Sequence, residues 1–318
     1  MNPDQRTSPA LVRANGIELC HDTFGDPAAP PLVLIMGLAA QMTAWDDEFC
    51  TALAARGLYV IRFDNRDIGL STRFTEAGVP DIAAAFAAVM QGQTVSAPYL
   101  LSDMAADVAD LLDALGIASA HVVGASMGGA IAQLMAIHHP ARLRSLTSIM
   151  ATTGAPDLPP PTPAALAALF KPPPRGLAEY QDSYVQTWQV LRGPGFVLDD
   201  ARDRARAAAN FARGLNPAGV ARQMMAIMAS GSRREALAAV RVPTLVLHGD
   251  ADPLVPLACG VDTAKAVPGA KLTVLPGMGH ALPISLWPQI VDAIAGHVAA
   301  PLASPAAGPL AGPVAASN

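Results

Sequence analysis

Residues 122–129, with the sequence VVGASMGG, constrain the fold of this chain more than any other stretch. Its apolar start is typical of a buried strand, its glycines of a sharp turn, and the residues after Gly129 have the spacing of a helix. Glycines two positions before and after Ser126 let strand and helix backbones pack closely, so that the turn lifts the serine hydroxyl clear of a sheet. Ser126 is therefore a candidate nucleophile, although small residues can also serve only to pack a strand-to-helix turn.

Apolar runs that alternate with helical patterns surround this turn. Residues 32–36 and 59–63 are typical of strands covered on both faces in a parallel sheet, and residues 45–57 and 102–115 have helical spacing. Further strands are predicted at 16–25, 143–150, 242–247 and 272–275, and a last helix at 286–298. The alternation predicts an α/β fold with a doubly wound, mainly parallel sheet, whose ligands bind beyond the carboxyl ends of the strands.

The pattern changes between residues 154 and 235, where Pro-rich turns separate short Ala-rich helical segments. We interpret this stretch as a helical cap inserted into a core domain formed by residues 1–153 and 236–298. A cap across the strand ends would exclude water and shape the choice of substrate. Residues 299–318 are rich in Ala, Pro, Gly and Ser and predict a disordered tail. The candidates for lining the pocket, each of which could instead be ordinary cap core, are Trp188, Phe196, Phe211, Met224, Met225 and Met228.

Length and charge narrow the possible functions. The 318 residues, 52% of them hydrophobic, suffice for one large core with a modest insertion, although two small domains are the alternative. The net charge of −5 is scattered, which argues against binding to nucleic acid and favours uncharged substrates. The N-terminus lacks the apolar core of a signal peptide, and charge, Pro or Gly interrupts the later apolar stretches. We therefore expect a cytoplasmic protein that does not bind membranes.

The cysteines and histidines do not indicate a metal site. Cys20, Cys50 and Cys259 are odd in number, far apart and without metal-ligand spacing, so we expect buried free thiols. His138 and His139 are adjacent near a helix end and would point to different faces, which makes them a poor ligand pair. We expect neither a metal nor another cofactor.

Two residues supply what a serine nucleophile lacks. Asp252 and His280 both follow predicted strands, in loops that a parallel sheet gathers at one end. An imidazole titrates near neutral pH, so His280 can take the proton of Ser126 and later give it to the leaving group. A carboxylate at Asp252 would orient the ring and stabilise its charged form. The order Ser, Asp, His along the chain matches that of the α/β hydrolases.

Other side chains compete for these roles. Asp250 lies two residues before Asp252, and Asp157 follows the preceding strand, where some hydrolases carry their acid. Asp252 is favoured over both. His248 lies on a strand, which indicates packing in the core.

Stabilisation of a tetrahedral oxyanion requires two backbone N–H groups fixed in place before the reaction. We assign one to Met127, directly after the nucleophile, and the other to Leu38, after the strand that ends near Gly37. The polar loop at 64–71 is interpreted as scaffold near the site, since its acids and arginines can hydrogen-bond neighbouring loops.

Four motifs resemble the α/β-hydrolase superfamily, and the resemblance covers residues 15–298. They are GASMGG at 124–129, RFDNRD at 62–67, DPLVP at 252–256 and GMGHALP at 277–283. Within the superfamily they are similar to the branch of carboxylesterases and aclacinomycin methylesterases. The resemblance implies a cofactor-free serine hydrolase with a helical cap and gives Ser126, Asp252 and His280 the roles of a catalytic triad.

One departure from many relatives is Met36 before Gly37, where they have His-Gly. The backbone donor survives this change, and side-chain support from a histidine does not. Serine at 126, rather than aspartate, argues against dehalogenase or epoxide hydrolase activity. We expect a carboxylesterase for uncharged, fairly apolar small-molecule esters, acting through an acyl-enzyme. Perhydrolase or acyltransferase activity with the same triad is the alternative, a non-catalytic binding protein is a third possibility, and assembly into a homodimer is left open.

Overall fold

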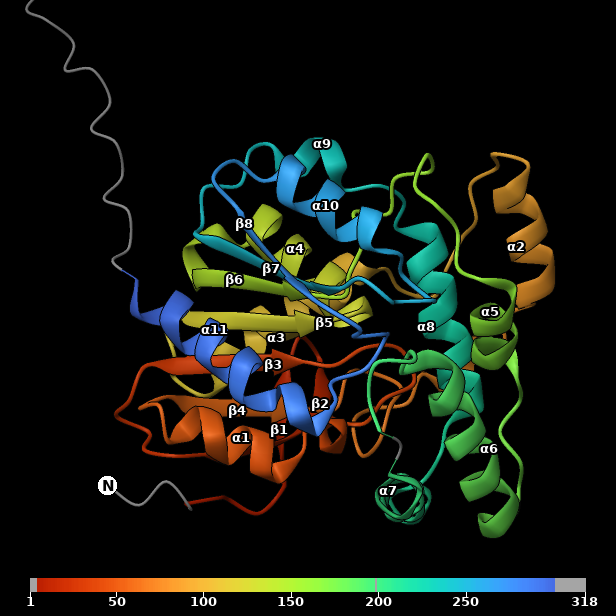
Figure 1. The fold of residues 1–318 in the computed structure, drawn as a ribbon, viewed down its shortest axis with the longest axis horizontal. Helices are drawn as coiled ribbons and strands as arrows, with labels where there is room; N and C mark the ends of the chain where they lie inside the picture. The colour runs from red at the N-terminus through yellow and green to blue at the C-terminus, as the bar shows by residue number, and fades with distance from the viewer. Residues whose placement is uncertain (1–4, 198, 301–318) are drawn as a thin grey trace, which may run out of the picture.

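The computed structural model describes residues 5–197 and 199–300. Eight strands form a sheet in the order β1-β2-β4-β3-β5-β6-β7-β8 (Figure 1). The strands are β1 Ala10–Ala14, β2 Ile17–Phe24, β3 Pro31–Ile35, β4 Tyr59–Phe63, β5 Ala120–Ala125, β6 Leu143–Ile149, β7 Thr244–Gly249 and β8 Lys271–Leu275. β2 is antiparallel to both β1 and β4, and every later pairing is parallel. The predicted α/β class with a mainly parallel sheet is confirmed.

Helices follow the strands in the predicted alternation. In the core they are α1 Asp47–Ala54, α2 Ile82–Met90, α3 Leu101–Ala114, α4 Met127–His138, α10 Leu257–Ala266 and α11 Trp287–Ala299. Between β6 and β7 come α5 Pro163–Phe170, α6 Leu177–Leu191, α7 Asp200–Arg213, α8 Pro217–Ala229 and α9 Arg234–Leu237. Short 3-10 helices lie at Met42–Ala44, Thr75–Ala77, Pro140–Arg142 and Ile284–Leu286. We call α5 to α8 the cap helices.

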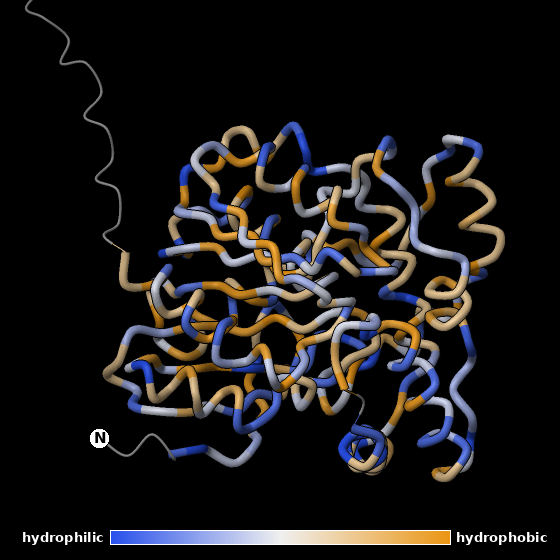
Figure 2. Tube along the Cα trace, in the orientation of Figure 1, coloured by the Kyte–Doolittle hydropathy of each residue, from blue (hydrophilic) through white to orange (hydrophobic). Residues whose placement is uncertain are grey.

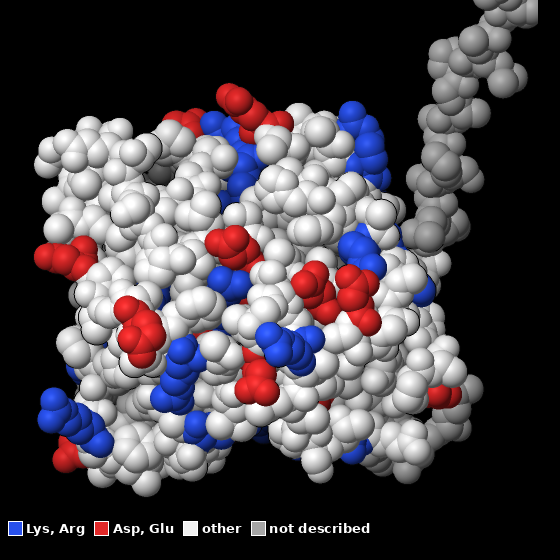
Figure 3. Space-filling view, turned by 180° about the vertical axis from the view of Figure 1, so that it is seen from behind, with Lys and Arg blue, Asp and Glu red and all other residues white. Residues whose placement is uncertain are grey.

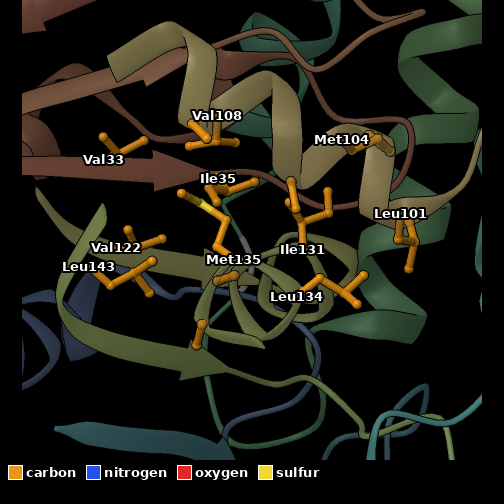
Figure 4. Packing of buried hydrophobic residues seen from close by; sticks show 14 of the residues in the cluster. Val33, Ile35, Leu101, Met104, Val108, Val122, Ile131, Leu134, Met135 and Leu143 are labelled. Atoms are coloured by element: carbon orange, nitrogen blue, oxygen red, sulfur yellow. The ribbon is translucent and has the colours of Figure 1, made fainter. Parts of the chain in front are cut away.

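Two layers of helices bury the sheet because successive side chains of a strand point to opposite faces. In β3, Val33 and Ile35 belong to one apolar cluster, whereas Leu32 and Leu34 belong to the other. α3 and α4 cover the first face, where Met135 packs among the strand side chains (Figure 4). α1 and α11 cover the second face. β3 is buried along its whole length, as its unbroken apolar sequence predicts.

The cap helices lie beyond the carboxyl ends of the parallel strands (Figure 1). α7 is rich in Arg and Asp and is the most hydrophilic of them (Figure 2). α8 packs against α2, a helix from the core sequence between β4 and α3. The cap region is thus built from helices, as expected, while residues 154 and 235 as the limits of a separate unit stay a prediction.

The structure corrects two details of the predicted elements. The helix expected at 45–57 is confined to Asp47–Ala54, because a 3-10 turn precedes it and Gly57, at φ +80°, turns the chain into β4. The helix at Ile82–Met90 was not predicted, since its sequence IAAAFAAVM has no polar face. From the predicted tail at 299–318, Ala299 ends α11 and residues 301–318 lie outside the described part.

The surface charges and the cysteines lie as the composition predicts. On the face seen in Figure 3, acidic and basic side chains are interspersed, without a broad area of either sign. Cys20, Cys50 and Cys259 are free and buried, as predicted. Among the described residues, no helix is long and apolar enough to cross a membrane.

Candidate active site

Ser126 occupies a strained turn between β5 and α4. Its backbone has φ +56° and ψ −121°, a conformation that residues with a side chain rarely adopt. The flanking glycines make the turn possible: a Cβ on Gly124 would lie 2.1 Å from the Gly128 carbonyl oxygen, and one on Gly128 would lie 2.1 Å from that of Ile35. The Ser126 N–H donates to the Ile149 carbonyl at 2.9 Å. The turn therefore presents the serine at the carboxyl end of β5.

A continuous hydrogen-bonded chain joins Ser126, His280 and Asp252. The Nε2 atom of His280 lies 2.9 Å from the Ser126 Oγ atom, and its Nδ1 atom lies 2.8 Å from the Asp252 Oδ2 atom. The Asp252 Oδ1 atom accepts the backbone N–H groups of Leu254 and Val255, at 2.9 and 2.8 Å. Because the buried carboxylate can only accept, Nδ1 is the donor and Nε2 is free to accept the serine proton.

The competing carboxylates lie elsewhere. Asp157 is exposed, and its carboxylate forms an ion pair with Arg234 at 2.8 Å. Asp250 is also exposed and accepts the backbone N–H of Gly277 at 2.6 Å. Asp250 therefore holds the loop that carries His280, while Asp252 contacts its ring.

His248 is fully buried at the end of β7, as its place in the sequence indicates. Its Nε2 atom lies 2.7 Å from the Val255 carbonyl oxygen and 3.7 Å from the Asp252 Oδ2 atom. Burial lowers the pKa of His248, which favours the neutral ring. A neutral His248 donates to Val255 and so supports the turn that holds Asp252.

The turn after β3, residues 36–39, lies directly against the serine; we call it the Gly37 turn. A Cβ on Gly37 would lie 3.1 Å from the Ser126 Cβ atom and 3.5 Å from its Oγ atom. Leu38 and Met127, the two predicted backbone donors, thus flank the serine and line the same cavity.

Side chains from two directions fix the Gly37 turn. Asn65 Nδ2 donates to the Met36 carbonyl at 2.8 Å, so the polar loop at 64–71 acts as scaffold, as interpreted from its sequence. From α8, Gln223 Oε1 accepts the Ala39 N–H at 3.2 Å. Ala39 has φ +64°, a conformation that only a well-held backbone keeps.

A cavity of about 1840 Å³ lies between the strand ends and the cap helices, with Ser126 and His280 in its wall. Four of the predicted cap residues line it: Trp188, Phe196, Met224 and Met228. The prediction was wrong for Met225, which is buried in α8 and does not line the cavity. Met225 is turned by about 100° from Met224 around the α8 axis, and its side chain is buried away from the cavity.

Three further aromatic residues of the cap lie differently from what their sequence positions predict. Phe211 does not line the cavity; its ring packs 5.9 Å from that of Tyr180. Tyr180 and Tyr184 do line the cavity, two turns and one turn before Trp188 on α6, respectively. Their four-residue spacing was the signal that could have identified them.

Among residues 5–197 and 199–300, no group of three or more His, Cys, Asp or Glu side chains could hold a metal ion. The side chains of Ser126, His280 and Asp252 can support proton transfer and nucleophilic attack by the serine.

Comparison with known proteins agrees with this geometry. The α/β hydrolase fold family matches residues 30–285. The rhodomycin D methylesterase DauP of Streptomyces sp. (strain C5) is 32% identical over 308 residues, covering 90% of this chain and 97% of DauP. The rhodomycin D methylesterase DnrP of Streptomyces peucetius is 31% identical with the same coverage. Among solved structures, the meta-cleavage product hydrolase CumD of Pseudomonas fluorescens IP01 has a TM-score of 0.70 at 19% identity, covering 91% of this chain and 96% of that chain.

The structural likeness supports the fold, and the two methylesterases confirm the resemblance to that branch of the superfamily. The family match covers most of the described chain. The chain therefore belongs to the α/β hydrolase fold family.

Proposed function

We propose that this esterase-type hydrolase is a serine carboxylesterase with Ser126 as nucleophile, His280 as base and Asp252 as the acid that orients the base. The observation that carries the proposal is the unbroken chain of contacts, 2.9 Å from Ser126 to His280 and 2.8 Å from His280 to Asp252. The family and its methylesterase relatives support the same class of reaction.

The reaction would proceed in two halves. His280 Nε2 takes the hydroxyl proton while the Ser126 Oγ atom attacks the ester carbonyl carbon. The N–H groups of Leu38 and Met127 receive the negative charge on the carbonyl oxygen. His280 then protonates the departing alcohol as the carbon–oxygen bond breaks, which leaves an acyl-enzyme. Water, deprotonated by His280, repeats these steps and releases the acid and free Ser126.

The cavity supports an uncharged and bulky ester as substrate. Its volume of about 1840 Å³ exceeds the roughly 300–1,000 Å³ of common ligand pockets. Trp188, Met224 and Met228 give it apolar walls. Of the arginines in its wall, Arg192, Arg202 and Arg206 are paired with aspartates, and Arg233 donates to the Gln133 side chain and to backbone carbonyls. Since two relatives are methylesterases, we favour the methyl ester of a large acid, with the acid in the cavity.

The test is burst-phase kinetics on p-nitrophenyl esters, followed by release of methanol from bulky methyl esters. The amount of p-nitrophenol released in the burst should equal the amount of active protein. Ser126→Ala should lower the rate of ester hydrolysis by roughly 10⁴-fold or more. Ser119→Ala, at the opposite end of β5, is the matched control and should leave the burst intact. Unchanged turnover in Ser126→Ala would rule out the proposed nucleophile. Transfer of the acyl group to added alcohol or peroxide, in preference to water, would instead identify an acyltransferase or perhydrolase.

A further inference from the structure

The C-terminal end of α6, a cap helix, is hydrogen-bonded to the loop that carries His280. The Leu191 carbonyl accepts the His280 N–H at 2.7 Å, and the Arg192 carbonyl accepts the Gly279 N–H at 3.0 Å. Carbonyl groups in the last turn of a helix have no partner within the helix. Here two backbone groups of the His280 loop provide that partner, so the cap holds the backbone of the proposed base directly.

Glycines allow the two segments to approach at backbone distance. A Cβ on Gly279 would lie 2.3 Å from the Arg192 carbonyl oxygen, and one on Gly195 would lie 2.4 Å from that of Gly277. A Cβ on Gly193, at φ +78°, would lie 3.0 Å from the Gly279 Cα atom. Any side chain at these positions would push the His280 loop and the end of α6 apart.

A buried ion pair fixes the end of α6 in turn. The Arg192 Nη2 atom lies 2.7 Å from each carboxylate oxygen of Asp203, which belongs to α7. Both side chains are almost fully buried, with 10% and 5% of their surface exposed. An ion pair in that setting has a defined geometry, since either charge without the other would be costly to bury. Two cap helices, α6 and α7, are thereby joined at the point where α6 meets the His280 loop.

We propose that Arg192 and Asp203 are positioning residues for His280, acting through the end of α6. Asp252 fixes the rotation of the imidazole ring, but the distance from Nε2 to Ser126 also depends on the backbone at Gly279 and His280. That backbone is bonded to the cap. A displacement of about 1 Å at a reacting group can cost about 100-fold in rate, so the cap contributes to the rate as well as to substrate choice. This inference rests on the proposed role of His280.

The experiment compares two variants with matched controls on two substrates. Gly195→Ala separates the backbones, and Asp203→Asn removes the charge that pairs with Arg192. Gly296→Ala, whose Cβ would meet open space on α11, controls for the first variant. Asp182→Asn controls for the second, because its exposed pair with Arg204 also joins α6 to α7. The substrates are p-nitrophenyl acetate, with a two-carbon acyl group, and p-nitrophenyl decanoate, with a ten-carbon one.

We expect the acylation rate constant of Gly195→Ala and Asp203→Asn to fall by about 10- to 100-fold on both esters, with KM changed by less than about threefold. The controls should match the wild type. A loss confined to the decanoate would mean that these residues contact substrate, which would overturn the proposal. A wild-type acylation rate constant in Gly195→Ala, the variant that retains the ion pair, would also overturn the proposal.

Two further measurements separate the possible failures. Thermal unfolding of each variant identifies a loss caused only by unfolding, and rates are then taken on the folded fraction. If the wild type shows no burst that depends on Ser126, the proposed function fails; if it shows one and the variants match it, only the positioning role fails.

Discussion

The sheet is joined to its flanking helices by apolar side chains, whereas the cap helices are joined to the loops of the sheet by ion pairs as well as by apolar contacts. Between α3, α4 and the sheet, buried Leu, Ile, Val and Met side chains form one continuous cluster. Among the described residues, five ion pairs link a cap helix to a core segment: Arg202 with Asp46 and Glu48, Arg206 with Asp46, Arg213 with Asp64 and Arg222 with Asp67. Apolar contact is non-directional, while a guanidinium–carboxylate pair fixes distance and orientation.

The comparison explains how a cap can be placed accurately over a site. Asp64 and Asp67 lie in the loop after β4 and are fully buried. The same loop supports the Gly37 turn through Asn65. The loop after β4 therefore supports both the position of the cap and the geometry of the active site. The contacts that hold the cap should depend more on pH than the apolar contacts between the sheet and its flanking helices.

The largest effect is expected for Arg222→Met. The Arg222 guanidinium contacts both carboxylate oxygens of Asp67, at 2.6 and 2.8 Å. Its loss leaves a buried carboxylate without a cation, which should lower the free energy of unfolding by about 3 to 5 kcal/mol at pH 7. Urea denaturation measures this change. In Arg222→Met with Asp67→Asn, neither charge remains, and most of the stability should return.

The pH dependence of that loss tests its origin. Burial alone would raise the pKa of Asp67, but hydrogen bonds from Arg222, Phe74 and Tyr99 outweigh it and hold the pKa below its ordinary value. The stabilisation is therefore complete above the ordinary aspartate value of about 3.9 and is lost as the pH falls below it. In Arg222→Met the burial cost disappears once Asp67 is protonated. The difference from wild type should shrink between pH 7 and pH 3.5, and a constant difference would contradict an electrostatic origin.

A core substitution should behave in the opposite way. Leu112 of α3 is fully buried in the apolar cluster on the α3 and α4 face. Leu112→Ala should cost about 3 kcal/mol through lost burial and the cavity left behind. Urea denaturation at pH 5 and pH 8 should give the same loss, because no charge is involved. The burst rate of the folded variant should equal that of the wild type, and a reduced rate would show that core and site are not separable in this way.

Much of this fold was predictable because its central strands, β3 to β7, are short and almost entirely buried. β3 and β4 carry apolar runs that predict strands, and the proposed triad of Ser126, Asp252 and His280 follows β5, β7 and β8. In a parallel sheet, residues that follow strands meet at one edge whatever their separation in sequence. The identity of the candidate site could therefore be predicted from the positions of its residues relative to strands.

Side-chain direction and long-range pairing were not predictable in the same way. Met224 and Met225 are the same residue type, and only the rotation of α8 about its axis decides which of them faces the cavity. α2 lacks a polar face, so periodicity could not identify it. The contact of Leu191 with His280 joins backbone groups 89 positions apart, and no residue type signals such a bond.

Gln223→Met should have an intermediate effect and would connect the cap to the other side of the site. Gln223 is fully buried; it accepts the Ala39 N–H and donates to the Arg66 carbonyl at 2.9 Å. Methionine has a similar volume and would leave both backbone groups unpaired, at a cost of about 1 to 3 kcal/mol in stability.

Because Ala39 belongs to the Gly37 turn, the acylation rate of Gln223→Met should also fall, with little change in KM. Stopped-flow measurement of the burst and urea denaturation of the same sample give the two quantities. A variant that is destabilised but acylates at the wild-type rate would limit Gln223 to a structural role.

The smallest effect is expected for Asp182→Asn, which completes the comparison with Arg222. Asp182 and Arg204 form an ion pair at 2.6 Å between α6 and α7, yet about half of each side chain is exposed. Water already solvates both charges, so removing one should change the free energy of unfolding by about 0.5 kcal/mol or less, and less still in 1 M NaCl. The Asp182 and Arg222 pairs have the same chemistry and nearly the same length, so burial is the main difference between the two sites. If Asp182→Asn were as destabilising as Arg222→Met, the number of ion pairs at the cap, rather than their burial, would have to explain how the cap is held.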